Sequence, residues 1–236
     1  MLTIILAVKD ANVKQLYGCI SSIAALKNSS HIDLMIVSSG ALPELLKEQT
    51  RFLNKITIID AEPLGVYSAF NRGIDEKPNG YILFIGVDDL VLPGLDRVID
   101  FILSVDDRPE VIAASAYRQD IGLAVPSQIR ASLIARNWCQ QGLLYHSRLF
   151  ENKRFDITYV VRADHKFNLE LAGDRQNKIA YRPDVITHFS AGGLSSQVED
   201  RKFITDMPAV VRRSYGLLFW LIALVIREVK WPGRQR

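Results

Sequence analysis

Continuous apolar runs alternate with segments of helical periodicity through the first half of the chain, and this alternation restricts the fold more than any other feature. Apolar residues dominate the runs Leu2–Val8, Ile32–Val37, Tyr81–Val87 and Val111–Ala116, and Lys55–Ile59 has the composition of a further strand. Such runs are typical of strands that other elements cover on both faces. Their regular recurrence predicts one central sheet.

Helical periodicity fills the intervals between these runs. Apolar residues recur with helical spacing over Val13–Leu26, Leu42–Phe52 and Val66–Ile74, and Pro93 suits the first turn of a helix that reaches about Ser104. Strands that alternate with helices predict an α/β fold with a mostly parallel, doubly wound sheet flanked by helices.

The second half of the chain is less regular. Residues 117–140 give mixed signals and predict loops and short elements, whereas Asp164–Ala172 has the spacing of a helix. Ile179–Tyr181 and Val185–Phe189 predict two short strands. Neither an internal repeat nor a low-complexity linker interrupts the chain, so residues 1–206 are expected to form one domain.

Residues 207–236 differ in character from the rest of the chain. The segment Tyr215–Ile226 is apolar on every side, but as a helix it would be only about 18 Å long, whereas the apolar layer of a bilayer is about 30 Å thick. Residues 201–236 hold eight Lys or Arg against two acidic residues, and Trp220 and Trp231 lie in or near the apolar run. Two predictions stay open for this C-terminal helix: peripheral binding to an anionic membrane surface, or packing against protein.

Cysteine content and charge exclude some classes of protein. Cys19 and Cys139 are the only cysteines, so a disulfide framework is not expected and a reducing cytoplasm fits best. The N-terminal segment lacks the basic start and the small-residue cleavage site of a signal peptide. No nucleic-acid-binding motif accompanies the net charge of +3, so nucleic acid is not expected as a partner.

Two adjacent carboxylates, Asp88 and Asp89, directly follow the buried run Tyr81–Val87. Ligands of open α/β sheets bind beyond the carboxyl ends of the strands. Neighbouring acids repel each other unless a cation or strong donors neutralise them, and a hard divalent cation binds such carboxylates together with substrate phosphates. The plainer alternative is a solvated turn in which Asp89 caps the helix that starts near Pro93.

Further segments follow one another in a specific order over residues 2–196. They are Gly65-Val-Tyr-Ser-Ala-Phe-Asn71-Arg72-Gly73, Gln140-Gln141-Gly142, Arg162-Ala-Asp164-His165 and His188-Phe-Ser-Ala-Gly-Gly-Leu-Ser195. Together with the aspartate pair they resemble glycosyltransferase family 2, whose members have the Rossmann-like GT-A fold. The resemblance is greatest to bacterial members that build O-antigen and exopolysaccharide.

This resemblance implies an inverting, metal-dependent transfer of a sugar from a nucleotide-diphosphate sugar, UDP-linked, to a glycan or lipid-linked acceptor. It implies Mg²⁺ or Mn²⁺ as cofactor, with Asp89 as a metal ligand and His188 completing the shell. Asp164 becomes the expected catalytic base, which takes the proton of the acceptor hydroxyl. The plainer alternatives are a helix N-cap for Asp164 and a neutral, hydrogen-bonded side chain for His188.

The resemblance also implies residues that contact the donor. Asp88 would face the ribose or the second coordination shell of the metal, Asn71 and Arg72 would contact the diphosphate, and Gln141 would contact a sugar. At two positions where the family commonly has an aspartate this chain has Ser38 and Pro63, and Glu62 beside the proline would substitute. The pair Gly192–Gly193 would belong to a flexible lid over the donor, and the enzyme would lie at the inner face of the cytoplasmic membrane.

Two other functions remain open. A sugar nucleotidyltransferase predicts a glycine-rich basic loop after the first strand, but Lys9-Asp10-Ala11-Asn12-Val13 contains no glycine. A non-catalytic subunit of a polysaccharide assembly complex would keep the fold alone, and the changed nucleotide-contact positions keep this alternative open. Nucleotide binding without transfer would favour it.

Overall fold

The computed structural model describes residues 1–9, 12–40, 42, 53–190 and 198–231. The helix expected at Leu42–Phe52 lies outside the described residues except for Leu42, and so does the glycine pair Gly192–Gly193.

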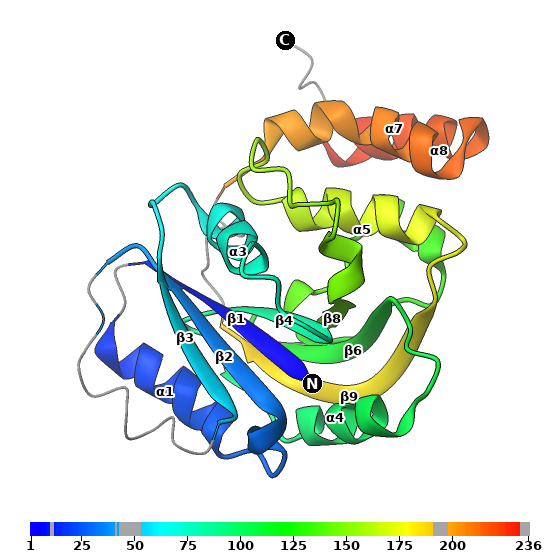
Figure 1. Cartoon of the computed structure of the whole chain (residues 1–236). Coiled ribbons are helices and arrows are strands. Elements are labelled where there is room, and N and C mark those ends of the chain that lie inside the picture. The colour runs from blue at the N-terminus through cyan, green and yellow to red at the C-terminus, as the bar shows by residue number, and fades with distance from the viewer. Residues whose placement is uncertain (10–11, 41, 43–52, 191–197, 232–236) are drawn as a thin grey trace.

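The described residues form one curled sheet with helices on both of its faces (Figure 1). The strands are β1 Leu2–Val8, β2 Ile32–Ser38, β3 Lys55–Asp60, β4 Tyr81–Gly86, β5 Leu90–Val91, β6 Val111–Arg118, β7 Gly122–Ala124, β8 Leu143–His146 and β9 Ile179–Phe189. The α-helices are α1 Val13–Ala24, α3 Val66–Ile74, α4 Gly94–Ser104, α5 Ala163–Gly173, α7 Arg201–Tyr215 and α8 Leu217–Lys230. Short 3₁₀ helices are η1 Ser29–His31, η2 Arg130–Ile134, η3 Gln140–Gly142 and η4 Ser147–Phe150.

The expected α/β fold with a mostly parallel sheet is confirmed, although the sheet is mixed and not purely parallel. Its strand order is β3-β2-β1-β4-β8-β6-β9-β5, with β7 paired to β6. The first four strands in this order are parallel, whereas β8 runs antiparallel to both β4 and β6. The antiparallel strand β8 was not predicted, because it is a short buried run and apolar composition does not encode the direction of a strand.

Alternating side chains of the central strands fill two cores, one on each face of the sheet. Ile4 and Leu6 pack with α1 and α4 on one face, whereas Ile5 packs with α3 on the other. This alternation is the two-residue period of an extended strand. Both faces are therefore buried, which is why the central strands are apolar throughout.

The two short strands expected at Ile179–Tyr181 and Val185–Phe189 are one continuous strand, β9. Its pairing with β6 shifts register between Tyr181 and Val185, so extra residues including Pro183 bulge out of the ladder. Proline is tolerated in a strand where a bulge removes the need for its missing N–H. The bulge explains why the sequence pattern is interrupted although the strand continues.

The C-terminal segment consists of two helices, not one. Gly216, with φ of +89°, separates α7 from α8, and the boundary expected between residues 206 and 207 lies within α7. In α7, Phe203, Met207 and Val211 are buried in the core that also contains α5. Within the described residues no helix has the length and apolar composition that crossing a bilayer requires.

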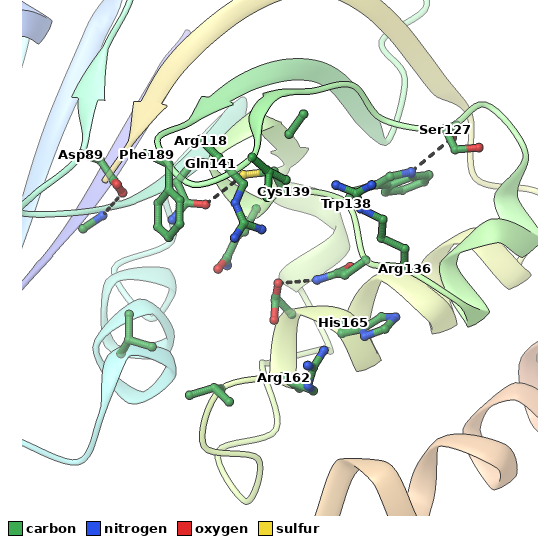
Figure 2. A pocket seen from close by; sticks show the side chains of 18 of the residues that line it. Asp89, Arg118, Ser127, Arg136, Trp138, Cys139, Gln141, Arg162, His165 and Phe189 are labelled. Atoms are coloured by element: carbon green, nitrogen blue, oxygen red, sulfur yellow. Dashed lines mark hydrogen bonds between the residues drawn. The ribbon is translucent and has the colours of Figure 1, made fainter. Parts of the chain in front are cut away.

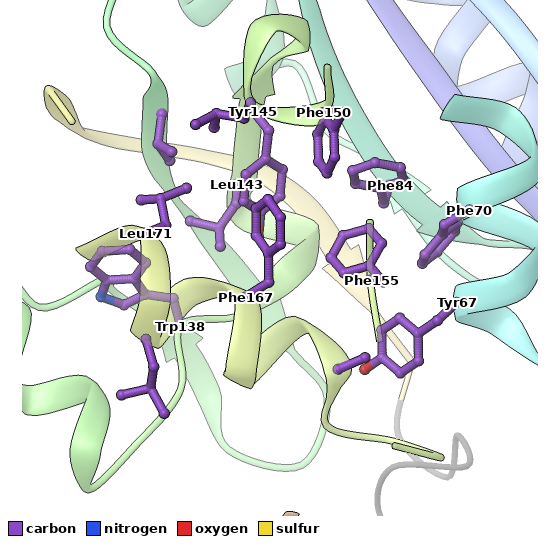
Figure 3. Close-up of a cluster of buried hydrophobic side chains, with 14 of the residues drawn as sticks. Tyr67, Phe70, Phe84, Trp138, Leu143, Tyr145, Phe150, Phe155, Phe167 and Leu171 are labelled. Atoms are coloured by element: carbon purple, nitrogen blue, oxygen red, sulfur yellow. The ribbon is translucent and has the colours of Figure 1, made fainter. Parts of the chain in front are cut away.

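An aromatic cluster fills the space between the sheet and α5 (Figure 3). Phe84 of β4 lies 5.2 Å from Phe155 between ring centroids, and Phe150 stacks on Phe167 of α5 at 5.1 Å. Aromatic pairs at these distances add packing energy to the burial of their area. The cluster fixes the N-terminal end of α5, and hence Asp164, above the carboxyl end of β4.

Candidate active site

A cavity of about 840 Å³ opens beyond the carboxyl end of β4 (Figure 2). Its wall comes from α3, the turn after β4, the ends of β6 and β9, β7, the segment 125–141 that includes η2 and η3, the start of α5 and the end of α8. Four of the residues expected at the site line it: Asp88, Asp89, Gln141 and Asp164. They come from three separate regions of the chain, which the fold brings to one hollow.

Asp89 is buried, with only 1% of its surface exposed. Its Oδ2 accepts a hydrogen bond from the Gly86 amide at 2.7 Å, so the turn after β4 folds onto this side chain. Its Oδ1 is buried without a hydrogen-bond partner among the described residues, although Gln141 and Ser190 lie near enough to lower its pKa. Burial nevertheless raises the pKa of Asp89 to about 7, and the charge of Asp88 adds to this rise.

The aspartate pair has the chemistry of a site for a hard divalent cation. Asp88 is half-buried beside Asp89, whose Oδ1 has no hydrogen-bond partner in the described part of the chain, so a cation there would relieve the repulsion and satisfy this oxygen. Within the described part of the chain, no three His, Cys, Asp or Glu side chains gather into a ligand shell. Asp88 and Asp89 therefore fit Mg²⁺ or Mn²⁺ only if substrate phosphates and water supply the remaining ligands.

Asp164 lies in the first turn of α5 and is also buried. Its Oδ1 accepts a hydrogen bond from the Tyr67 hydroxyl at 2.6 Å, and its Oδ2 accepts one from the Asn137 amide at 2.6 Å. Burial raises the pKa of Asp164, whereas these two hydrogen bonds lower it. The balance leaves a carboxylate that is more basic than an exposed aspartate but remains firmly oriented.

The hydrogen bonds at Asp164 continue into the core. Asn137 accepts a bond from Asn168 at 3.0 Å, and Asn168 accepts one from the Tyr145 hydroxyl at 2.8 Å. Asn168 and Tyr145 are fully buried. A buried network in which each member is satisfied holds its side chains in a single arrangement.

His165, next to Asp164, is occupied by other contacts and is not assigned a part in proton transfer. Its Nε2 lies 2.6 Å from the Leu133 carbonyl oxygen, and its ring stacks on Phe203 with centroids 4.8 Å apart. Burial lowers the pKa of His165 to about 4, so the ring is neutral. Through these two contacts the His165 side chain connects α5 with η2 and α7.

Gln141 is positioned by a close approach of two backbones. A Cβ atom on Gly142 would lie 2.6 Å from the Ala114 carbonyl oxygen, so only glycine lets η3 pack this tightly on β6. The Gln141 carbonyl accepts a hydrogen bond from Thr187 at 2.9 Å, and its side chain accepts one from Cys139 at 3.4 Å. These contacts keep Gln141 beside Asp89.

Five other residues expected at the site do not line the cavity, namely Ser38, Glu62, Asn71, Arg72 and His188. Asn71 exchanges two hydrogen bonds with the Phe155 backbone, and Arg72 forms an ion pair with Glu76 at 2.6 Å. The Ser38 hydroxyl bonds to the Gly40 backbone, Glu62 is exposed, and His188 stacks on Tyr117. Their assignment to donor or metal binding stays a prediction.

Sequence reasoning missed Tyr67 and Asn137, the two residues that hold Asp164. Tyr67 belongs to the Gly65–Gly73 segment that carries the family resemblance, so its position was signalled although its role was not. Asn137 lies in residues 117–140, where no periodicity or motif marks it. Its contact with Asp164 exists only because η2 and α5 pack together.

Comparison with known proteins finds similarity to glycosyltransferases in both sequence and fold. No model of a protein family matches the chain. The chain is 27% identical over 224 residues, covering 91% of it and 85% of the relative, to a PGL/p-HBAD biosynthesis glycosyltransferase of Mycobacterium bovis, and equally to one of Mycobacterium tuberculosis. The resemblance to bacterial glycosyltransferases that was inferred from the motifs is thereby confirmed at the level of this class.

Solved structures confirm the fold. TarS of S. aureus, residues 1–349 in complex with UDP-GlcNAc, superposes with a TM-score of 0.74 at 11% identity, over 99% of this chain and 74% of that one. A mannosyltransferase of Pyrobaculum calidifontis in complex with GDP-Man and Mn²⁺ gives a TM-score of 0.60 at 11% identity, over 97% and 73% of the two chains. The chain spans 44% of the longer TarS structure.

Proposed function

We propose that this chain is an inverting glycosyltransferase of bacterial surface glycan synthesis, which moves a sugar from a UDP-linked donor to a hydroxyl of a glycan or lipid-linked acceptor. The observation that carries the proposal is that one cavity holds both the aspartate pair at the end of β4 and the buried, doubly hydrogen-bonded Asp164. The names of the relatives and the nucleotide sugars in the neighbouring structures support it.

Each carboxylate has a distinct part in this reaction. Asp88 and Asp89 would hold a divalent cation beside the donor diphosphate, and such a cation would supply positive charge for the leaving diphosphate. Asp164 accepts the proton of the acceptor hydroxyl as its oxygen forms a bond to the anomeric carbon and the bond from that carbon to the diphosphate breaks. Attack opposite the leaving group inverts the anomeric configuration. Tyr67 and Asn137 hold the Asp164 carboxylate during the transfer.

A nucleotide-sugar binding screen tests the proposed function. UDP-glucose, UDP-N-acetylglucosamine and GDP-mannose are offered with Mg²⁺, with Mn²⁺ or with chelator, and the melting temperature is recorded. A ligand that binds only the native state raises this temperature, so we expect stabilisation by a UDP-sugar that disappears with chelator. No stabilisation under any condition would contradict the proposal, and stabilisation without release of UDP to any acceptor would favour a non-catalytic subunit.

Removing the Tyr67 hydroxyl is expected to shift the pH dependence of the reaction. In Tyr67→Phe the ring contacts with Phe70 and Phe155 remain, but Asp164 loses a hydrogen bond that stabilises its charged form. The pKa of Asp164 therefore rises further, and the acidic limb of the kcat/KM profile moves to higher pH by about one unit, the usual effect of one hydrogen bond to a charge.

The control is Tyr159→Phe, which removes a hydroxyl that bonds to Asp206 and does not line the cavity. Its pH profile should match that of the wild type. If kcat/KM of Tyr67→Phe is lower at every pH but its acidic limb does not move, Tyr67 positions the substrate and does not set the pKa of Asp164.

The outer face of α8 supports the proposal that the enzyme binds the inner face of the cytoplasmic membrane. Phe219, Ala223 and Ile226 pack against the protein. The opposite face exposes large apolar side chains, Leu217, Leu218, Leu221, Ile222, Val225 and Val229, with exposed fractions from 42% to 75%. Arg212 and Arg213 at the end of α7 lie next to this face in sequence, and cations there favour anionic lipid.

Acidic substitutions on this face are expected to abolish membrane binding without unfolding the protein. Leu218→Glu and Val225→Glu replace exposed side chains, so the fold should persist, whereas sedimentation with phosphatidylglycerol vesicles should be lost. Val160→Glu, an exposed apolar position outside α8, is the control and should sediment like the wild type. Undiminished sedimentation would contradict membrane docking, and a dimer that dissociates in the variants would assign the face to a second copy of the chain.

A further inference from the structure

Three cationic side chains from distant parts of the chain gather in the cavity wall around Trp231. They are Arg136, which follows η2, Arg162, which precedes α5, and Lys230, which ends α8. The Arg162 guanidinium carbon lies 5.9 Å and the Lys230 Nζ 5.8 Å from the centroid of the Trp231 ring. Lys230 also donates a hydrogen bond to the carbonyl of Ala135, the residue before Arg136. We call Arg136, Arg162 and Lys230 the cationic cluster.

The cationic cluster is separate from the aspartate pair within the same cavity. In Figure 2, Asp89 lies at one side of the cavity, whereas Arg136 and Arg162 lie at the other side with His165. The donor diphosphate is assigned to the aspartate side, because only there does the described chain offer a carboxylate pair for a metal. A second anion at the cationic cluster would therefore not be the donor's.

Within the described residues no member of the cationic cluster forms an ion pair, whereas nearby cations do: Arg118 pairs with Asp120, and Arg227 pairs with Glu228. The charge of Arg162 lowers the pKa of Asp164, but the two side chains do not form an ion pair. Asp164 is the acid nearest along the chain to Arg162, but both of its oxygens already accept hydrogen bonds from Tyr67 and Asn137. Partial burial, and then the positive charges of Arg162 and Arg136, lower the pKa of Lys230, so the three cations lie close enough to interact.

We propose that the cationic cluster is a second anion subsite, which binds a phosphate or diphosphate group carried by the acceptor. The assignment to the acceptor rests on the proposed function, since Asp164 marks where the acceptor hydroxyl lies. Two guanidinium groups and an ammonium match phosphate oxygens in both charge and donor geometry. Lys230 ends the helix whose outer face is apolar, so a phosphate attached to a lipid would reach the cluster from the membrane side.

The test measures binding of a short soluble probe, geranyl diphosphate, by calorimetry with Mg²⁺ and saturating UDP present. We expect the wild type to bind the probe while UDP occupies the donor side. Arg136→Gln and Lys230→Gln, both exposed, should each weaken probe binding about tenfold or more, the scale of a hydrogen bond to a charged group. Affinity for UDP should remain that of the wild type in both variants.

Arg213→Gln is the matched control, because it removes one exposed positive charge from α7 outside the cavity. It should leave probe binding unchanged. Displacement of the probe by UDP, or wild-type affinity in Arg136→Gln and Lys230→Gln, would overturn the subsite.

Three further probes identify the source of the anion. Geraniol should bind far more weakly than geranyl diphosphate, and equal binding would overturn the proposal. Inorganic pyrophosphate that binds as tightly as the probe would assign the subsite to a free phosphate and overturn its assignment to the acceptor. The third probe is a phosphatidylglycerol vesicle. If the wild type does not bind geranyl diphosphate, and Arg136→Gln and Lys230→Gln no longer bind these vesicles, the acceptor assignment is overturned and the cationic cluster is assigned to lipid headgroups.

The same measurements separate this inference from the proposed function. A wild type that binds the probe at the cationic cluster but no nucleotide sugar would leave the anion subsite standing and overturn both the glycosyl transfer and the acceptor assignment. A wild type that binds a UDP-sugar with metal but not the probe would keep the proposed function and overturn the subsite.

Discussion

Asp164→Asn is expected to reduce turnover by about 100-fold or more, which is the usual contribution of a general base. The amide has the same shape as the carboxylate and keeps an oxygen for the Tyr67 hydroxyl, although it loses the hydrogen bond from Asn137. The start of α5 also packs in the aromatic cluster, so it should stay in place. Donor binding should change little, because the aspartate pair belongs to another element. Single-turnover rates with bound UDP-sugar, together with calorimetric UDP affinity, separate the two effects.

The matched control is Asp174→Asn, the same change at the other end of α5, on an exposed side chain that bonds to the Gln176 amide. Its turnover should equal that of the wild type. If donor affinity falls together with turnover in Asp164→Asn, Asp164 is a donor ligand or a structural residue and not the base.

Asp89→Asn is expected to have opposite effects on metal binding and on stability. The variant loses an anionic ligand, so metal-dependent UDP binding should disappear. The metal-free variant, however, should be more stable than the wild type at pH 8, by up to about 4 kcal/mol when the rise of the Asp89 pKa to about 7 is converted at about 1.4 kcal/mol per unit. The Asn oxygen can still accept the Gly86 hydrogen bond.

The sign follows from the direction of the pKa shift. The pKa of Asp89 is about 7 in the folded chain, compared with 3.8 as its usual value. Folding therefore favours the protonated form, and the wild type loses stability as the pH rises from about 4 to about 7 and keeps that loss above 7. In Asp89→Asn this part of the pH dependence should vanish. Chemical denaturation with chelator, across this pH range, measures it.

Asp107→Asn is the control for both readouts. Asp107 is exposed in a surface ion pair with Lys178, and such pairs contribute little to stability. Wild-type metal affinity in Asp89→Asn would remove Asp89 from the site, and a lower metal-free stability would show that its buried charge is compensated in the native protein.

The central fold could be predicted because its strands are buried on both faces. Leu2–Val8 and Tyr81–Val87 were recognised from their apolar runs and are β1 and β4 within one residue. The antiparallel β8, the bulge at Pro183 and the break at Gly216 were not, because each depends on what the segment pairs with or packs against. Local sequence patterns indicate whether a segment forms a helix or a strand, but not the direction in which a neighbouring strand runs.

The candidate site was predictable only where a residue follows a strand or belongs to a motif. Asp88 and Asp89 were found from the end of β4, and Asp164 from the resemblance. Asn137 and the cationic cluster were not, since their members lie in irregular segments and in the last residues of α8. Ninety-seven residues separate Tyr67 from Asp164, and only the packed fold makes them partners.

Helix α8 contributes to two surfaces, the outer face of the protein and the wall of the cavity. Its apolar side faces outward, while its last residue, Lys230, lines the cavity beside Trp231. If the outer face binds lipid and the cationic cluster binds acceptor, any coupling between the two events through α8 is thermodynamically reciprocal. Vesicles would then change acceptor affinity by the same factor by which acceptor changes vesicle affinity. An enzyme of this kind would distinguish an acceptor in a bilayer from the same headgroup free in solution, without a separate regulatory domain.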